Sequence, residues 1–211
     1  MQLKSTHLKD GQPIQSDYAF GQPGSNGEHF APAANLTPPL AWSEVPDTAR
    51  SFVITVIDPD VPSVGDDVNQ EGRSVPIDLL RVEFVHWLMA NIPLDCRELG
   101  EGSCGDGIVA HGKQEPFGPP GSVQGCNDYT GWFADDPDMA GRYLGYDGPC
   151  PPWNDERLHH YHFEVHALDV ARLDLAAGFS LADLRAAMQG HVLASAKITG
   201  TYTMNPALRS G

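Results

Sequence analysis

The chain of 211 residues has the length of one domain, and with 41% hydrophobic residues it can bury a core. Its 22 glycines and 18 prolines, with only 19% charged residues, indicate many turns between short strands rather than a linker. A net charge of −15 argues against nucleic acids and anionic membrane surfaces as partners, because an acidic surface repels phosphate groups at long range.

No stretch is long and apolar enough for a transmembrane helix, so we expect no integral membrane association. Residues 1–10 are polar and lack the apolar core of a signal peptide, which predicts a cytoplasmic protein. The four cysteines form no CxxC pair. Bridges between Cys96 and Cys104 or between Cys126 and Cys150 are conceivable, but free thiols are favoured in the cytosol.

Two buried strands are predicted after a loop-rich segment at residues 1–50. Residues 50–57 are apolar and β-branched, which is typical of a central strand. We expect this strand to end in residues 58–62, because the two prolines there interrupt hydrogen bonding between strands. Residues 63–80 are polar and predict an exposed loop, and residues 81–92 predict the next strand.

The second half begins with a connection rich in glycine and proline, residues 94–157, and long ordered loops often carry function. A strand of period two follows it. One face of that strand carries His159, Tyr161, Phe163, Val165 and Ala167, and the other carries His160, His162, Glu164 and His166.

A helix is predicted over residues 180–189, with Ser180 and Asp183 forming a weak capping box and Gly190 ending it. A final strand is predicted over residues 197–203. We find no internal repeat and no second domain, so we expect residues 1–211 to form a single unit.

Acidic and histidine side chains lie at the ends of the predicted strands. Asp58 and Asp60 follow a buried strand on a backbone fixed by proline, although such aspartates more often cap backbone amides. Alternation places His86 on one face with Phe84 and Leu88, where a histidine is more often a satisfied core residue than a ligand.

The loop 146–152 (YDGPCPP) combines glycine and proline, so that its amides can cradle an anion or simply form a rigid surface. An HxH pair such as His160 and His162 can bind zinc on a strand. The pattern fits a polar, solvent-facing strand at least as well, and we expect no metal and no cofactor. No common nucleophile, phosphate-loop or dinucleotide motif is present.

Four motifs occur in this order along the chain: DPDxP at 58–62, His86-Trp87, GPCPP at 148–152 and His159-x-Tyr161. In this order they resemble the phosphatidylethanolamine-binding protein family, and in particular its bacterial Raf-kinase-inhibitor-like branch. Supporting segments are LTPPLAW at 36–42, GCNDYTGW at 125–132 and GHVLASAKITGTY at 190–202. The resemblance covers roughly residues 30–204, while segments 63–80 and 131–145 look expanded and His160 stands where an arginine is common.

The resemblance implies a mostly β fold, an antiparallel Greek-key β-sandwich with a few peripheral helices. It also implies a non-catalytic pocket for small anions, phosphorylated ligands or phospholipid headgroups. The matching ligand-binding residues are Asp58, Asp60, His86, Gly148, Pro149, His159 and Tyr161.

Two further expectations come from the relatives. Eukaryotic members inhibit kinases or proteases, so a kinase or protease is a candidate protein partner, and bacterial members often form homodimers. The alternative function is a hydrolase that uses an aspartate–histidine pair of the same pocket as its general base.

Overall fold

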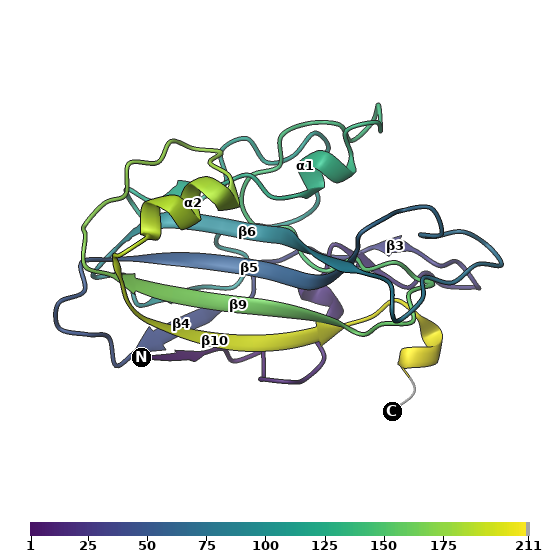
Figure 1. Ribbon diagram of the computed structural model, residues 1–211, viewed down its shortest axis with the longest axis horizontal. Coiled ribbons are helices and arrows are strands. Elements are labelled where there is room, and N and C mark those ends of the chain that lie inside the picture. Colours follow the sequence, from purple (N-terminus) through teal and green to yellow (C-terminus); the bar gives the residue numbers. More distant parts are fainter. Residues whose placement is uncertain (210–211) are drawn as a thin grey trace.

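The computed structural model describes residues 1–209, a mostly β structure with few helices, as the sequence predicts (Figure 1). The strands are β1 (Gln2–Lys4), β2 (Gly21–Gln22), β3 (Ala31–Pro32), β4 (Leu40–Ser43), β5 (Ser51–Pro62), β6 (Arg81–Pro93), β7 (Glu98–Leu99), β8 (Val123–Gln124), β9 (His159–Leu168) and β10 (Val192–Tyr202). The helices are α1 (Tyr129–Trp132) and α2 (Leu181–Met188), with 3-10 turns η1 (Ser16–Tyr18) and η2 (Pro206–Leu208).

Two antiparallel sheets form the body of the fold. The larger one has the strand order β10-β9-β5-β6-β8, and a smaller one has the order β1-β4-β7. Within the larger sheet the long connection after β8 returns β9 to the side of β5. This order is that of a Greek key, so the predicted topology is confirmed.

The core fills the space between the two sheets and also the outer side of the larger sheet. Trp42 and Leu99 of the smaller sheet pack with Phe52, Trp87 and Phe163 of the larger one. Helix α2 covers the opposite face, where its own apolar side chains pack on those of β5 and β6. The larger sheet is therefore buried on both faces along much of β5 and β6, which explains their continuous apolar runs.

The predicted alternation of the strand at residues 159–168 is confirmed, because its burial alternates residue by residue along β9. Helix α2 is confirmed as well. Ser180 caps it, accepts from the Asp183 amide and completes a capping box. Gly190 follows at φ +82°, a conformation that suits glycine after a helix.

Two strands are longer than predicted. β10 begins at Val192 rather than at Lys197, and β5 continues through both prolines to Pro62. Pairing between β5 and β9 stops at Ile57, and the register against β6 shifts between Asp58 and Val61. Pro59 lies in this irregular stretch, so its lack of an amide hydrogen interrupts no regular hydrogen bond between strands.

His86 is the extra residue of a β-bulge in β6. Val56 pairs with Trp87 and Ile57 pairs with Val85, so no residue of β5 faces His86. A bulge interrupts the alternation of faces along a strand. Leu88 accordingly packs toward α2 while His86 faces a pocket on the other side, and the prediction that they share a face is wrong.

All four cysteines are free thiols, and Cys104 is buried. Among residues 1–209 no helix has the length and apolar character needed to cross a membrane.

Candidate functional site

A pocket of about 330 Å³ lies where β5 ends and β9 begins. Residues of α1 and of the segment 63–69 line it. Its wall is largely aromatic, formed by Phe20, Phe30, Phe84, Tyr129, Trp132 and Phe133. Asp58, His86, His159 and Tyr161 supply its polar end. This size and this mixture of many apolar and few polar groups are typical of a small-molecule site.

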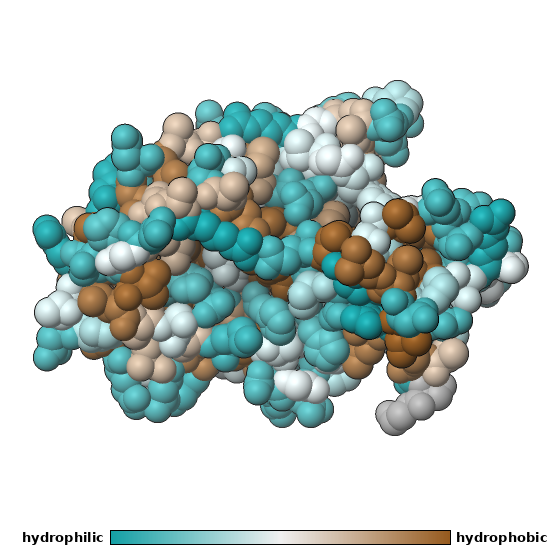
Figure 2. All heavy atoms as spheres, viewed as in Figure 1, coloured by the Kyte–Doolittle hydropathy of each residue, from teal (hydrophilic) through white to brown (hydrophobic). Residues whose placement is uncertain are grey.

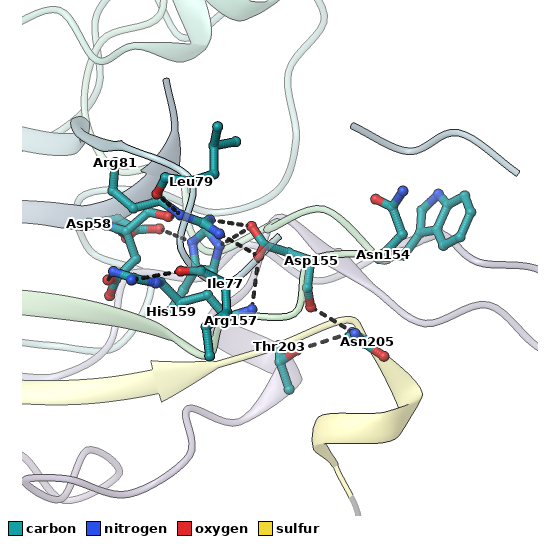
Figure 3. Close-up of polar contacts among 12 residues, drawn as sticks. Asp58, Ile77, Leu79, Arg81, Asn154, Asp155, Arg157, His159, Thr203 and Asn205 are labelled. Atoms are coloured by element: carbon teal, nitrogen blue, oxygen red, sulfur yellow. Dashed lines mark hydrogen bonds and ion pairs between the residues drawn. The ribbon is translucent and has the colours of Figure 1, made fainter. Parts of the chain in front are cut away.

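A buried chain of charged groups runs behind the polar end of the pocket (Figure 3). The His159 Nδ1 lies 2.6 Å from Oδ2 of Asp58, and its Nε2 lies 3.1 Å from Oδ2 of Asp155. The Arg81 guanidinium holds Asp155 with two hydrogen bonds, of 2.5 and 3.0 Å. The four side chains are almost fully enclosed, with exposed fractions of at most 5%.

His159 is positively charged in this arrangement. A carboxylate accepts hydrogen bonds, so both ring nitrogens of His159 must donate. Burial by itself would lower the pKa of His159, but the hydrogen bonds and charges of Asp155 and Asp58 outweigh it and raise that pKa to about 9. Both N–H groups are taken, and His159 keeps no donor for a ligand. The charges of Asp58, His159, Asp155 and Arg81 then sum to zero.

His86 behaves differently. Its Nδ1 lies 2.8 Å from the main-chain oxygen of Asp147, and its ring packs edge-on against Tyr161, with centroids 5.1 Å apart. Burial lowers the pKa of His86, although nearby carboxylates oppose this. Within residues 1–209 the Nε2 atom of His86 has no hydrogen-bond partner. Trp42 Nε1 is the only side-chain nitrogen or oxygen of these residues that is both fully enclosed and unpaired. The unpaired Nε2 of His86 is therefore accessible, and His86 lines the pocket.

Asp60 faces away from the pocket. Its carboxylate accepts from the main chain and the ring of His160, at 3.0 and 2.8 Å, and from Arg157 at 3.2 Å. Burial would raise the pKa of Asp60, but these partners hold it below its usual value. Arg157 thus forms an ion pair with Asp60 next to position 160, where an arginine is common in the family that the sequence resembles. Asp60 still supports the site, because its amide donates to Asp58 Oδ1 at 2.7 Å.

Gly148 and Pro149 lie behind the wall of the pocket and do not line it. The Gly148 amide donates to Asn35, and its carbonyl accepts from the Tyr129 hydroxyl. A Cβ at position 148 would lie 2.1 Å from a main-chain oxygen, so the close approach requires glycine. The adjacent Cys150 does line the pocket, and within residues 1–209 its amide forms no hydrogen bond.

The mouth of the pocket is apolar. Phe30, Val64 and Trp132 line it and are 47%, 52% and 53% exposed. Figure 2 shows further apolar residues gathered at the right of that view, beyond the ends of β5 and β6. Exposed apolar side chains in that part of the chain are Ile77, Leu80 and Val82. A mouth of this kind favours a ligand that has an apolar part.

The structure brings Asp58, His86, His159 and Tyr161 together, as the motifs predict, although they come from three separate strands. Sequence reasoning missed Asp155, Arg81 and most of the aromatic wall. Tyr129 and Trp132 lie in the segment GCNDYTGW, which was noted only as supporting resemblance. No pattern marks Asp155 or Arg81, since a loop residue and the first residue of a strand carry no periodicity.

The histidines at positions 160 and 162 of the outer face hold hydrogen bonds to Asp60 and Thr199. Within residues 1–209 no group of three or more histidine, cysteine or acidic side chains could hold a metal ion.

The sequence profile described as "Phosphatidylethanolamine-binding protein" matches residues 4–203 of the chain. The chain belongs to this family. The UPF0098 protein YbhB of Escherichia coli is 33% identical over 96% of this chain and all of its own length. A UPF0098 protein of Methanothermobacter thermautotrophicus is 35% identical over 96% of this chain and 98% of its own.

Solved structures agree with this family assignment. The crystal structure of Escherichia coli YbcL, described as a member of the mammalian PEBP family, aligns with a TM-score of 0.67 at 28% identity. The alignment covers 96% of this chain and 97% of YbcL. A putative PEBP homologue from Chlamydia trachomatis aligns with a TM-score of 0.63 at 29% identity, over 95% of each chain.

In this PEBP-family protein the polar end of the pocket offers few, distinct groups to a ligand. They are one imidazole nitrogen of His86, the phenol of Tyr161 and the carboxylate of Asp58. Cys150, whose amide has no partner within residues 1–209, also lines the pocket. Burial, followed by the charge of Asp58, raises the pKa of Tyr161 well above its usual value, so this phenol remains neutral. Among residues 1–209 no lysine or arginine lines the pocket.

Proposed function

We propose that this protein is a non-catalytic binding protein for a small phosphorylated or otherwise anionic ligand, including a phospholipid headgroup of the phosphatidylethanolamine type. The observation that carries the proposal is a pocket with a narrow polar end and an aromatic wall, in a chain of the PEBP family. The phosphate would lie at His86, Tyr161 and the Cys150 amide, and the rest of the ligand would lie along the aromatic side chains.

The charge of the pocket favours a ligand with low net charge. The Asp58 carboxylate and the His159 imidazolium both line the polar end and balance each other, and no lysine or arginine within residues 1–209 lines the wall. A zwitterion such as phosphoethanolamine fits this setting better than a bare dianion. Its ammonium group can lie near Asp58 and over aromatic faces, which attract cations, while one proton on His86 or on the phosphate reduces the remaining repulsion.

The hydrolase alternative would have to use His86. The Asp58–His159 pair has no free nitrogen, because both nitrogens of His159 are bonded to carboxylates. His86 does present a free nitrogen to the pocket, which is the requirement for a general base. Release of inorganic phosphate from a phosphomonoester, lost on His86→Ala, would favour this alternative over simple binding.

We further infer a cytoplasmic location, to which four free thiols are suited. A kinase or protease whose activity depends on ligand occupancy is the proposed kind of protein partner, and a homodimer is the proposed assembly. Light scattering would test the dimer, and pull-down from lysate with and without phosphoethanolamine would test the partner.

The direct test is calorimetric titration with phosphoethanolamine and with inorganic phosphate. His86→Ala removes a hydrogen bond to a charged group, so we expect affinity to fall roughly ten- to hundredfold. His191→Ala is the matched control, because His191 is bonded to Asp169 at 2.8 Å and does not line the pocket. Equal affinity in both variants and the wild type would place the ligand elsewhere and refute the proposal.

A further inference from the structure

A second buried ion pair lies directly behind His86. The Lys113 ammonium is 2.6 Å from Oδ1 of Asp147, and the two side chains are 9% and 1% exposed. The same ammonium donates to the main-chain oxygen of Tyr146 at 3.0 Å. Lys113 is far from Asp147 in sequence, and neither residue lines the pocket.

Two amides complete the coordination of the Asp147 carboxylate. Asn35 Nδ2 donates to its Oδ1 and Asn127 Nδ2 donates to its Oδ2, both at 2.8 Å. The same two side-chain nitrogens also donate to the main-chain oxygens of Gly107 and Gly145. The carboxylate is therefore held by donors from three distant segments and cannot turn without breaking several buried hydrogen bonds.

The main chain of Asp147 is what contacts His86. Its amide donates to the His86 carbonyl at 3.1 Å, and its carbonyl oxygen lies 2.8 Å from the His86 Nδ1. A carbonyl oxygen can only accept, so Nδ1 must carry the proton. In the neutral ring the other nitrogen, Nε2, then presents a lone pair to the pocket.

We propose that Lys113 and Asp147 are positioning residues for His86: their buried pair fixes the Nδ1–H tautomer, so that the pocket binds a ligand oxygen that carries its own proton. The positioning of His86 by Lys113 and Asp147 is independent of the proposed function, whereas the preference for a protonated ligand oxygen rests on it. The ligand group that fits is the monoanion of a phosphate or phosphomonoester, whose P–O–H donates to Nε2. A sulfate has no such proton at neutral pH and should bind less well.

The charged groups around His86 agree with a neutral ring that accepts. Asp58 faces it from β5, Asp147 from the loop before β9, and Asp128 from the segment before α1. Lys113 balances Asp147, and His159 balances Asp58. Burial has the largest effect on His86 and keeps its pKa below 6.5, although the carboxylates oppose it.

The first test reads the tautomer in the ligand-free wild type. Two-bond proton–nitrogen spectra of ¹⁵N-histidine-labelled protein separate the two neutral tautomers and the imidazolium, and His86→Gln assigns the signal among the nine histidines. We expect the neutral Nδ1–H form at pH 7. An Nε2–H ring or an imidazolium at that pH would overturn the proposal whatever the ligand does.

The second test uses charge variants with opposite expected effects. Lys113→Met leaves the Asp147 charge unbalanced and should move the His86 titration midpoint upward by roughly half a pH unit or more. Asp147→Asn should move the midpoint downward. The double variant removes both charges and keeps the interior neutral, so it can replace a single variant that fails to fold, and its midpoint should lie between those of the single variants. Lys197→Met is the control, because Lys197 is exposed on β10. Shifts that match the control would overturn the positioning role.

The third test compares inorganic phosphate with sulfate by calorimetry at pH 6. We expect phosphate to bind at least about tenfold more tightly, the value of one good hydrogen bond to a charged group. Equal binding of sulfate would refute the selection of a protonated oxygen. If neither anion nor phosphoethanolamine binds, the proposed function fails, and the tautomer spectra still decide the role of Lys113 and Asp147.

Discussion

Raising the pH should destabilise this protein through one residue, His159. Its pKa is raised to about 9, because the carboxylates of Asp155 and Asp58 outweigh the effect of burial. The unfolded chain binds the same proton with a pKa of about 6.5. A folded-state pKa above the unfolded one gives stability that is fully present below pH 6.5 and is lost as the pH rises through about 9.

The difference between these pKa values corresponds to roughly 3 kcal/mol at pH 6. By pH 8.5 less than about 1 kcal/mol of it remains, so His159 alone should lower the free energy of unfolding by roughly 2 kcal/mol over this range. Burial lowers the pKa values of His86, His162 and His166, and these three residues act in the opposite direction. No discount for solvent screening applies, since the His159 side chain is 0% exposed. The buried thiols add little below pH 8.5, because thiols in the unfolded chain also remain largely protonated there.

Urea unfolding at intervals between pH 6 and 8.5 measures this loss, with His191→Gln as a control that keeps the effect. A double variant with Asp155→Asn and His159→Gln removes the titrating group together with one of its carboxylates. The free energy of unfolding of the wild type, relative to this variant, should therefore fall by roughly 2 kcal/mol over the range. The His159 ring signals should also remain those of an imidazolium at pH 8. A difference between the wild type and the double variant that does not change with pH, with the His159 ring titrating near pH 6.5, would refute the reasoning.

Three further changes have expected outcomes. Gly148→Ala places a Cβ 2.1 Å from a main-chain oxygen and should cost about 1–3 kcal/mol of stability. Gly131→Ala is the control, because a Cβ there meets open space and should cost almost nothing. Similar melting temperatures of the two variants would contradict this. Arg81→Met removes the guanidinium from Asp155 and leaves the buried cluster with an unbalanced negative charge, which should cost about 3–5 kcal/mol in urea unfolding. The exposed Arg185→Met should cost less than about 1 kcal/mol. Phosphoethanolamine affinity should weaken as the pH rises from about 6 to 8 and should lose that dependence in His86→Ala, as calorimetry at several pH values will show.

Local patterns predicted the elements that have a clear period or cap. The alternating strand at residues 159–168 and the capped helix after Ser180 follow directly from residue spacing. The ordered motifs also predicted that Asp58, His86 and His159 meet, which local sequence does not require. These predictions succeeded because each depends on neighbours in the chain or on a whole set of motifs.

The errors arise where tertiary structure overrides a local rule. The two prolines after Asp58 do not end β5, because the strand has already lost its partner β9 on one side. The bulge at His86 reverses the faces of the following residues, so period two misplaced Leu88. The partners Asp155 and Asp147 lie in loops that have no periodicity, and only the folded arrangement shows that they set the proton positions of the two histidines.

The two buried histidines have different electrostatic roles, because His159 is held charged in an ion-pair cluster whereas the pKa of His86 is lowered by burial. The charges of Asp58, His159, Asp155 and Arg81 cancel, so this cluster can hold the end of the sheet together without giving the pocket a net charge. The overall charge of −15 therefore does not by itself decide what binds there. The protonation of His86, or of the ligand oxygen that meets it, remains the variable charge at the polar end. Because one proton shared between two groups titrates as a single system, affinity alone cannot locate that proton, and the ring spectra of His86 become the decisive measurement.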